Sequence, residues 1–393
     1  MSAAHVLYSN PCPAPTLYMA AELAWGQWKL GFTTGLAQPA RLRTIPARDT
    51  HALMLEIDRA KQRFGLPADA PVVSCYEAGR DGFWLHRFLL QQGVQNLVVD
   101  AASIEVNRRR RRAKSDRLDA GKLASMLVRW HNGEQKLWAI VQAPRAEDED
   151  ARHVHRELME LKDERTAHVN RMKGLLAGLG LVLSVDRRLP DRLDGLRQWN
   201  DTPVPPELRA RLLREFQRWQ LVEDQIRALE AEQRRRIQQD ETAGVSTMRL
   251  LLGLKGVGLQ GAWLLTRELF GWRHFQNRRQ VGGLSGLTGT PYSSGDTERE
   301  QGISKAGNKR LRWMMVELAW SWRRYQPHSA LSQWYERRFG RAGPRQRKVG
   351  IVALARKLLI ALWKYVAHGE VPDGAETVPW DHKVIGWRKL AAA

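Results

Sequence analysis

The fold of the first part of the chain is decided by the stretch LYMAAELAWGQWKLGFTTGLAQPARLRTI, residues 17–45. Three short apolar segments lie within it, at 17–21, 28–32 and 41–45, and turn-forming Gly, Gln and Pro residues separate them. Short apolar runs divided in this way are typical of β-strands joined by turns. The stretch therefore predicts three antiparallel strands in a meander.

Alternating helices and strands follow this meander. Residues 49–64 and 83–92 carry apolar residues at helical spacing. Residues 70–76 and 96–99 are short apolar runs that indicate buried strands. The order β-β-β-α-β-α-β, followed by a helix, is that of an RNase H-like α/β domain, although other mixed sheets share it.

The middle of the chain predicts two long amphipathic helices. In residues 154–176 the apolar residues lie on one stripe. A second segment, 206–239, repeats apolar residues every seven positions, as coiled coils do. We expect a helical hairpin or coiled coil, whose apolar seam is buried either within one chain or between subunits.

The remainder of the chain is expected to be almost all helical. Segments 248–254, 260–270, 309–324 and 349–368 have helical spacing, whereas 369–393 has few apolar positions and is expected to be a loosely held tail. Core packing is expected for the tryptophans at core-facing spacing, which are Trp25, Trp28, Trp84, Trp313 and Trp320.

The composition favours a nucleic-acid partner. The chain has 63 Lys and Arg against 42 Asp and Glu, a net charge of +21, and its 43% hydrophobic residues indicate a folded protein. Charged residues interrupt the apolar run 351–366, which argues against a membrane span. With only Cys12 and Cys75 and no signal-peptide pattern, a cytoplasmic protein without disulfides is expected.

Four acidic residues form a candidate metal site. Glu22 ends the first predicted strand, Glu77 follows the fourth, and Asp116 and Asp119 begin the next helix, where a spacing of three shares one face. Carboxylate oxygens suit Mg²⁺ or Mn²⁺, and two such ions can assist phosphodiester cleavage. Each acid alone could equally be a solvated carboxylate or a helix cap.

Three basic or glycine-rich segments are candidates for phosphate contacts. Five consecutive arginines lead into the acids, KGVG at 255–258 is a turn between helices, and a Lys- and Arg-rich segment opens the helix near 309. A solvated loop and a purely structural turn are the alternatives for the first two. The predicted contacts are Arg108, Arg109, Arg110, Arg111, Arg112, Lys114, Lys255, Gly256, Gly258, Lys305, Asn308, Lys309, Arg310 and Arg312.

A nucleophile is predicted in GLTGTPYSSG, residues 286–295, which has the composition of a loop of small residues with exposed hydroxyls. A serine beside a glycine can reach phosphorus, and nearby cations stabilise the charge of phosphoryl transfer. Serine is also common in turns for backbone reasons, so the spacing alone leaves a structural role open.

The motifs taken together resemble the IS110/IS1111 family of insertion-sequence transposases, in the family's order. They are AEL at 21–23, YEAG at 76–79, KSDRLDA at 114–120, LKGVG at 254–258, SG at 294–295 and ISKAGN at 303–308. The resemblance covers residues 17–368. It implies a RuvC-like DEDD domain over 1–145, a coiled coil over 146–243, a transposase domain with a catalytic serine over 244–368, and a tail over 369–393.

Carried onto this sequence, the resemblance assigns the catalytic residues. Ser294 is implied as the nucleophile, with the adjacent Ser293 and the more distant Ser304 as alternatives. The first acid is Glu here, one methylene longer than the Asp of the family pattern. The metal ligands implied for Mg²⁺ or Mn²⁺ are Glu22, Glu77, Asp116 and Asp119.

The family resemblance also implies function and partners. It implies a recombinase guided by a structured bridge RNA, which cleaves and rejoins donor and target DNA as a dimer or tetramer in the bacterial cytoplasm, at the nucleoid and without a membrane. Base pairing would then read the sequence, and the protein would contact mostly backbone. Two alternatives remain: a RuvC-like metal-dependent structure-selective endonuclease without a covalent intermediate, and a non-catalytic nucleic-acid chaperone.

Overall fold

The computed structural model describes residues 15–104, 116–294, 297–305 and 307–382. For 102, 116–119, 291–294 and 297–301 it describes the backbone alone. The chain divides into two compact units, Met1–Pro144 (unit 1) and Arg145–Ala393 (unit 2). The finer division expected from the sequence stays a prediction.

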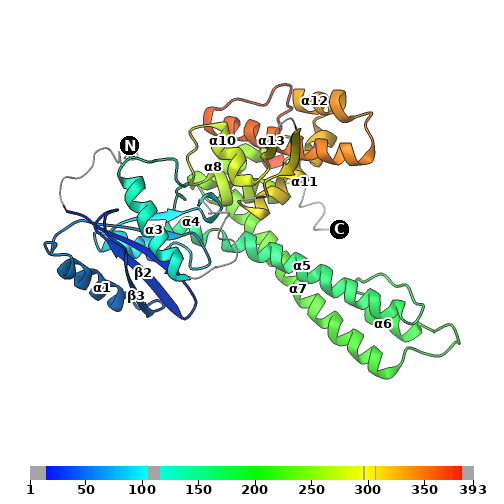
Figure 1. Cartoon of the computed structure of the whole chain (residues 1–393). Coiled ribbons are helices and arrows are strands. Elements are labelled where there is room, and N and C mark those ends of the chain that lie inside the picture. The colour runs from blue at the N-terminus through cyan, green and yellow to red at the C-terminus, as the bar shows by residue number, and fades with distance from the viewer. Residues whose placement is uncertain (1–14, 105–115, 295–296, 306, 383–393) are drawn as a thin grey trace. The chain divides into compact units, whose positions relative to one another are not determined.

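Unit 1 is built on a mixed five-stranded sheet (Figure 1). Its strands, which confirm the five predicted from the sequence, are β1 (Leu17–Leu23), β2 (Gln27–Thr33), β3 (Arg41–Pro46), β4 (Val72–Glu77) and β5 (Gln95–Val99). β1 pairs antiparallel with β2 and parallel with β4, while β2–β3 is antiparallel and β4–β5 parallel. The resulting order is β3-β2-β1-β4-β5.

The helices of unit 1 are α1 (Thr50–Arg63), α2 (Trp84–Gln91), α3 (Asp116–His131) and the short 3₁₀ turn η1 (Ala101–Ser103). Side chains alternate in direction along a strand, so each face of the sheet forms a core of its own. Leu17 and Met19 of β1 pack in one buried cluster with α1 and α2. Tyr18 and Ala20 pack in another with α3. The unit is therefore an α/β domain with helices on both faces.

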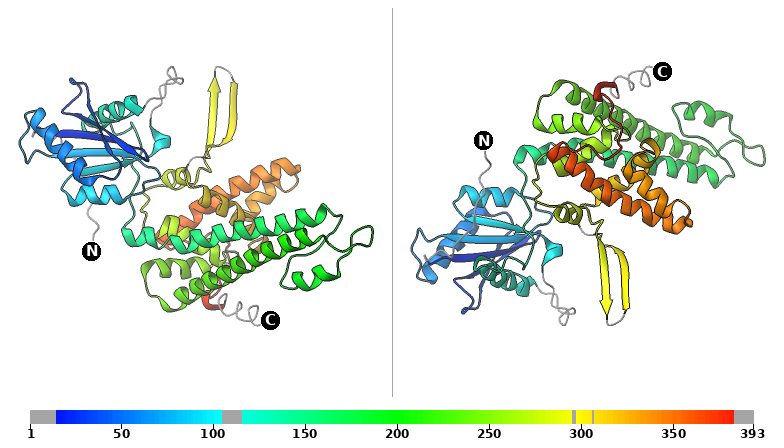
Figure 2. Two further views of the ribbon diagram at one scale, coloured as in Figure 1. Left: turned by 90° about the horizontal axis from the view of Figure 1, so that it is seen from below. Right: turned by 90° about the horizontal axis from the view of Figure 1, so that it is seen from above.

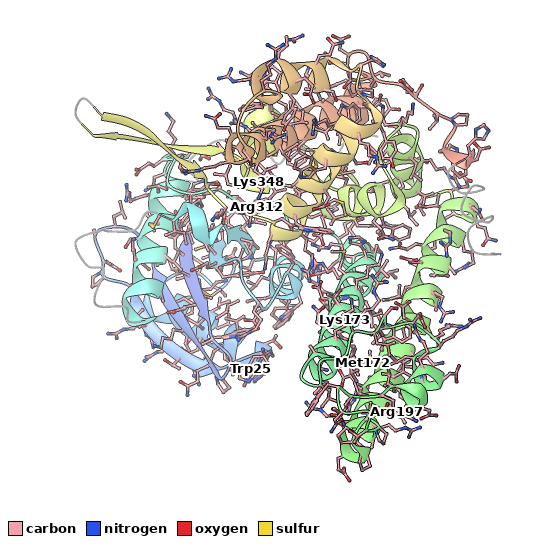
Figure 3. All side chains as sticks on the ribbon, turned by 90° about the vertical axis from the view of Figure 1, so that its right-hand side faces the viewer. Trp25, Met172, Lys173, Arg197, Arg312 and Lys348 are labelled. Carbon is pink, nitrogen blue, oxygen red and sulfur yellow. The ribbon has the colours of Figure 1, made fainter. Side chains whose placement is uncertain are left out.

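Unit 2 begins with a hairpin of two long helices (Figure 1). Its elements are α4 (Ala146–Asp150), α5 (His153–Ala177), α6 (Leu189–Gly195) and α7 (Pro206–Gln239). The ion pairs Lys162–Glu230 at 2.8 Å and Arg165–Glu223 at 3.4 Å require α5 and α7 to run antiparallel. Met172, labelled in Figure 3, is fully buried in their apolar seam. The seam thus closes within one chain, which is one of the two arrangements that the heptad pattern allows.

A helical body completes unit 2. It contains α8 (Ala243–Leu252), α9 (Leu259–Leu265), the π-helical turn η3 (Thr266–Phe270), α10 (Arg278–Ser285), α11 (Lys309–Tyr325), α12 (Ala330–Phe339) and α13 (Pro344–His368). These helices share one buried apolar cluster. Among the helices in the described ranges, none has the length and apolar character that crossing a membrane requires.

An antiparallel hairpin of β6 (Gly289–Ser294) and β7 (Thr297–Ile303) lies between α10 and α11. The expectation of an irregular loop over 286–295 is therefore wrong for residues 289–294. Their small residues carry no clear alternation, but pairing with β7 gives their backbone groups hydrogen-bond partners.

The expectation of a loosely held tail is wrong for residues 369–382. The N–H of Val378 donates to the carbonyl oxygen of Gly253 at 2.8 Å, and the N–H of Ala330 donates to that of Asp373 at 3.0 Å. Trp380 also packs against the core of the helical body. These contacts join segments far apart in the chain, so local apolar spacing could not indicate them. Residues 383–393 lie outside the described residues.

The prediction of a core position is wrong for three of the five tryptophans. Trp28 is fully buried and Trp84 packs against the same cluster, but Trp25 lies in the turn between β1 and β2 and is 68% exposed. Trp313 and Trp320 are 47% and 41% exposed. Both lie on the outer side of α11, because its other side already fills the core with residues such as Leu311, Met315 and Trp322.

Candidate functional site

Two adjacent parallel strands bring Glu22 and Glu77 to one edge of the sheet in unit 1. Ala21 of β1 lies opposite Tyr76 of β4, so the two glutamates occupy the next row of the register. Glu22 is half-buried and Glu77 is exposed. Both line one cavity of about 330 Å³. The two glutamates at neighbouring strand ends therefore border the same cavity.

The helix α3 reaches the same cavity. Gly31 of β2 permits its close approach, because a Cβ atom there would lie 2.9 Å from the carbonyl oxygen of Ala120. Leu123, one turn into the helix from that point, lines the cavity. Asp116 and Asp119 precede Leu123 by about two turns and one turn of the same helix. The backbone of α3 is described at these two positions, and their side chains lie outside the description.

The metal site itself stays a prediction. Among the side chains that the structure describes, no three His, Cys, Asp or Glu gather closely enough to hold an ion. That set leaves out Asp116 and Asp119. Two carboxylates lining a small cavity have the donor chemistry that Mg²⁺ or Mn²⁺ prefers, and a complete site needs more oxygen ligands than these two supply.

A further group of side chains borders the cavity, and the sequence did not indicate it. Asp81 lines the cavity, is almost buried, and accepts a hydrogen bond from Arg48 Nη2 at 3.1 Å. Arg48 and Arg80 both lie over the ring of Trp25, at 4.6 and 4.7 Å from its centroid. Guanidinium groups and exposed aromatic rings are common contacts of phosphates and bases. Arg48 and Asp81 are 33 residues apart, so no local pattern could pair them.

Ser293 and Ser294 lie on the β6–β7 hairpin, which Figure 2 shows as two yellow strands projecting from the helical body. Ser294 is the last residue of β6 and pairs with Thr297, and Ser293 precedes it. Ser304 follows β7, and its backbone N–H donates to the carbonyl oxygen of Thr288 at 2.8 Å. The side chains of Ser293 and Ser294 lie outside the description, so the choice of nucleophile stays open.

Gly307 and Asn308 fix the base of this hairpin. Gly307 has φ of 79°, and a Cβ atom there would overlap the carbonyl oxygen of Leu284. Asn308 caps α11, since its Oδ1 accepts hydrogen bonds from two N–H groups of the first turn at 3.0 and 3.1 Å. Its Nδ2 donates to Glu268 Oε2 at 3.1 Å. These contacts give the two residues a structural role, and contact of Asn308 with nucleic acid stays a prediction.

A buried charged cluster lies beside this base, on the π-helical turn η3. Glu268, 3% exposed, accepts hydrogen bonds from Arg156 at 2.8 and 3.0 Å, and Arg152 lies 3.9 Å away. Burial lowers the pKa of His155 to about 4, so this ring is neutral at pH 7. Burial also lowers the pKa of Arg273 to about 10, which leaves it charged. The cluster ties α5 to the helical body.

The turn at 255–258 makes contacts that favour its structural interpretation. Lys255 Nζ is paired with Glu376 at 2.6 Å, and Gly256 has φ of 90°, which a glycine adopts without strain. Gly258 precedes the first turn of α9 and lines a cavity of about 520 Å³ whose wall includes two glutamates. The same wall includes Arg234, and one of the glutamates, Glu230, is paired with Lys162 at 2.8 Å. Phosphate binding by this turn remains untested.

The other predicted nucleic-acid contacts lie near the start of α11 or outside the described residues. Arg310 is paired with Glu160 of α5 at 3.0 Å, and Arg312 donates to the carbonyl oxygen of Lys305 at 2.9 Å. The side chains of Lys305 and Lys309 are exposed. The residues that lie outside the description are Arg108, Arg109, Arg110, Arg111, Arg112 and Lys114.

Similarity to known proteins falls on both units. Residues 248–334 match the family model described as "Transposase IS116/IS110/IS902 family". The chain is 39% identical over 374 residues to "Putative transposase y4rJ" of Sinorhizobium fredii, across 91% of this chain and 94% of that protein. It is 29% identical over 231 residues to "Transposase for insertion sequence element IS1328" of Yersinia enterocolitica, across 58% and 66% of the two chains.

The match over residues 248–334 and the 39% identity over most of the chain define the class, a transposase of insertion sequences. The chain belongs to the IS110 family of transposases. The resemblance seen in its motifs is therefore confirmed, and membership implies a role in DNA transposition.

Proposed function

We propose that this transposase is an RNA-guided DNA recombinase, which cleaves and rejoins donor and target DNA through a serine nucleophile assisted by a magnesium-binding acidic cluster. The observation that carries the proposal is the cavity at the edge of the sheet, which Glu22, Glu77 and Leu123 line together. Because α3, which supplies Leu123, begins with Asp116, the proposed acids come from three neighbouring elements.

The strand order supports an RNase H-like, RuvC-like assignment of unit 1. In the order β3-β2-β1-β4-β5 the central strand β1 has an antiparallel neighbour on one side and a parallel neighbour on the other. This arrangement brings an acid near the end of β1 beside an acid at the end of β4. Unit 1 would then be the metal-dependent half of the enzyme.

The proposed metal site has oxygen ligands only. When bound, Mg²⁺ or Mn²⁺ would supply positive charge that polarises a phosphate and offsets charge in the transition state. Arg80 lines the same cavity and would donate hydrogen bonds to a phosphate oxygen beside it. The residues proposed as ligands are Glu22, Glu77, Asp116 and Asp119.

The proposed covalent step conserves the energy of the phosphodiester bond. The Ser294 hydroxyl oxygen bonds to phosphorus and loses its proton, the bond from phosphorus to the departing deoxyribose oxygen breaks, and that oxygen gains a proton. Attack of a deoxyribose hydroxyl from another strand on the phosphoserine reverses these changes, which joins the new strands and restores Ser294. No external energy source is needed.

Because the acids lie in unit 1 and the serine in unit 2, we propose that subunits combine them in a composite site within a dimer or tetramer. The apolar seam of the α5–α7 coiled coil closes within one chain, so contacts between subunits would use the other faces of these two helices. The net charge of +21 supports two polyanionic partners, a structured bridge RNA and the donor and target DNA. A bacterial cytoplasmic location at the nucleoid would follow from those partners.

Trapping of a covalent protein–DNA species tests this function against the two alternatives. The recombinase must form an adduct that disappears in Ser294→Ala. The structure-selective endonuclease would cut DNA in the Ser294→Ala variant and form no adduct, and the chaperone would neither cut nor form one. Sequencing of RNA that copurifies with the protein tests the guide: a discrete structured RNA is expected, and its absence from active protein would exclude RNA guidance.

A further inference from the structure

The end of α12, the turn that follows it and the start of α13 carry a dense cluster of exposed positive charge. Six cations and no acid occupy residues 337–348, which we call the basic turn. It begins three residues beyond the segment that matches the family model. Its cations are Arg337, Arg338, Arg341, Arg345, Arg347 and Lys348, the last of which Figure 3 labels.

These six side chains are exposed and have no carboxylate partner. Among the described residues, no side-chain hydrogen bond, ion pair or ring contact involves any of them. The arginines of the α5–α7 hairpin differ, because many of them are already neutralised. Arg209 pairs with Asp194 at 2.5 Å and Arg235 with Glu232 at 2.7 Å. A cation that is already paired releases few counterions when a polyanion arrives, whereas an unpaired one releases its own.

The backbone of the basic turn is held firmly by the helices on either side. Tyr335 of α12 is fully buried, and its hydroxyl donates to the carbonyl oxygen of Arg347 at 3.2 Å. Gly350 of α13 packs on Phe339 so closely that a Cβ atom would lie 2.5 Å from the ring. A Cβ atom added to Gly340 would lie 2.6 Å from the carbonyl oxygen of Glu336. The cations therefore project from a fixed turn, which lowers the conformational entropy lost when they bind.

We propose that the basic turn binds the phosphate backbone of duplex DNA without reading its sequence. Six neighbouring unpaired cations repel each other, and a regular polyanion removes that repulsion. Duplex DNA is favoured over RNA because the family acts in DNA transposition. The proposal rests on family membership and not on the serine or metal chemistry, so it can fail or succeed independently of the proposed function.

The test is the salt dependence of duplex binding by full-length protein in which all six cations of the basic turn are replaced by Gln. The probe is a DNA duplex of about 30 base pairs with arbitrary sequence, titrated between about 50 and 200 mM salt. The slope of log K against log salt should shrink by about 0.9 for each phosphate that the variant no longer neutralises, and affinity at about 100 mM salt should fall at least about tenfold. An unchanged slope would overturn the proposal.

A matched variant separates local binding from total charge. This variant has the same net charge as the basic-turn variant, because it also replaces six cations by Gln. The six are ion-paired arginines of the hairpin segment, namely Arg187, Arg192, Arg209, Arg227, Arg235 and Arg236. Its slope should change by less than that of the basic-turn variant. An equal change of slope in both would mean that only overall charge matters, and would overturn the proposal.

Three further measurements exclude misfolding and identify the polyanion. A variant with all five arginines of the basic turn changed to Lys keeps the charge and should retain the slope, while thermal unfolding should give similar midpoints for every variant. An RNA duplex of equal length is titrated in parallel. If the Gln variant bound RNA more weakly but DNA as before, the basic turn would be an RNA surface and the proposal would be wrong.

Discussion

The acidic edge of the sheet in unit 1 and the β6–β7 hairpin in unit 2 position their candidate residues in different ways. Glu22 and Glu77 lie on hydrogen-bonded strands of a sheet whose two faces are both buried. Ser294 lies on a two-stranded hairpin that extends from the helical body, as Figure 2 shows, and is set by Gly307 and Asn308 at its base. A lone two-stranded hairpin is only marginally stable.

The fold therefore holds the proposed acids more rigidly than the proposed serine. Removal of an acid should therefore change the reaction and leave the fold intact. Changes at the base of the hairpin should disturb both the fold of unit 2 and the reach of the serine.

Replacement of an acid should have the largest effect. Glu77→Gln removes one charge from the cavity without changing its shape, and we expect strand cleavage with Mg²⁺ to fall on the order of a thousandfold. The unfolding midpoint should stay near that of the unchanged protein. Asp58→Asn, on the exposed side of α1, is the matched control and should cleave normally. Equal activity of the two variants would remove Glu77 from the proposed site.

Gly307→Ala should disturb the base of the hairpin. The new methyl group would overlap the carbonyl oxygen of Leu284, and residue 307 would keep a positive φ that alanine disfavours. We therefore expect the free energy of unfolding of unit 2 to fall by about 4 kcal/mol. Misplacement of the serine should slow strand transfer about a hundredfold. The control is Gly302→Ala in β7, where φ is also positive but no atom lies within 4 Å of the added Cβ. Its cost should be about 1 kcal/mol. An equal loss of stability in the two variants would show that backbone strain alone, without atomic overlap, explains why residue 307 is glycine.

Acid should weaken unit 2 through His155. Its pKa of about 4 in the folded chain lies below the ordinary 6.5, so between these values the unfolded chain binds more protons. The contribution of neutral His155 to the free energy of unfolding is fully present above about pH 6.5. It should fall by about 3 kcal/mol as the pH drops towards 4. Glu268, Arg156, Lys162 and Arg310 are the charged groups that act on the ring.

His155→Leu should remove most of this pH dependence. Neither ring nitrogen has a hydrogen-bond partner, so the substitution leaves no described polar group newly unsatisfied. His153→Leu, at an exposed position of the same helix, is the control and should keep the full dependence. Chemical denaturation at several pH values measures both. An identical pH profile for the two variants would contradict the assignment to His155.

Gly31→Ala should have the smallest effect of the series and act on unit 1 alone. Its Cβ would lie 2.9 Å from the carbonyl oxygen of Ala120 and push the start of α3 outward, at about 2 kcal/mol. Cleavage should then need more Mg²⁺, because α3 carries two of the proposed ligands. Gly26→Ala, with no atom within 4 Å of its Cβ, is the control. If Gly31→Ala needed no more Mg²⁺ than the unchanged protein, α3 would not be part of the metal site.

The sequence predicts the sheet of unit 1 well because burial on both faces leaves a plain apolar signal in β1, β2, β4 and β5, whereas the edge strand β3 buries only Ile45. The same signal, with the acids of β1 and β4 at strand ends, predicts that Glu22 and Glu77 lie near each other. It failed where contacts join distant segments. Glu376, which binds Lys255 across 121 residues, holds a segment that was expected to be loose.

Tryptophan positions and short elements were harder to predict. Spacing indicates which residues share a helix face but not which face is buried, so Trp313 and Trp320 were assigned to the wrong side of α11. The hairpin at β6 and β7 has small and charged residues without clear alternation, and the pairing of its strands is visible only in the structure.

The most direct test of the serine mechanism is mass spectrometry of peptides from protein trapped on a nicked donor DNA that cannot be rejoined. We expect one nucleotide-bearing peptide, with the phosphoester on Ser294, and its loss when Glu77 is changed to Gln. An adduct on Ser293 or Ser304 would show that this serine, and not Ser294, is the nucleophile. Efficient DNA cleavage with no modified serine would contradict the mechanism.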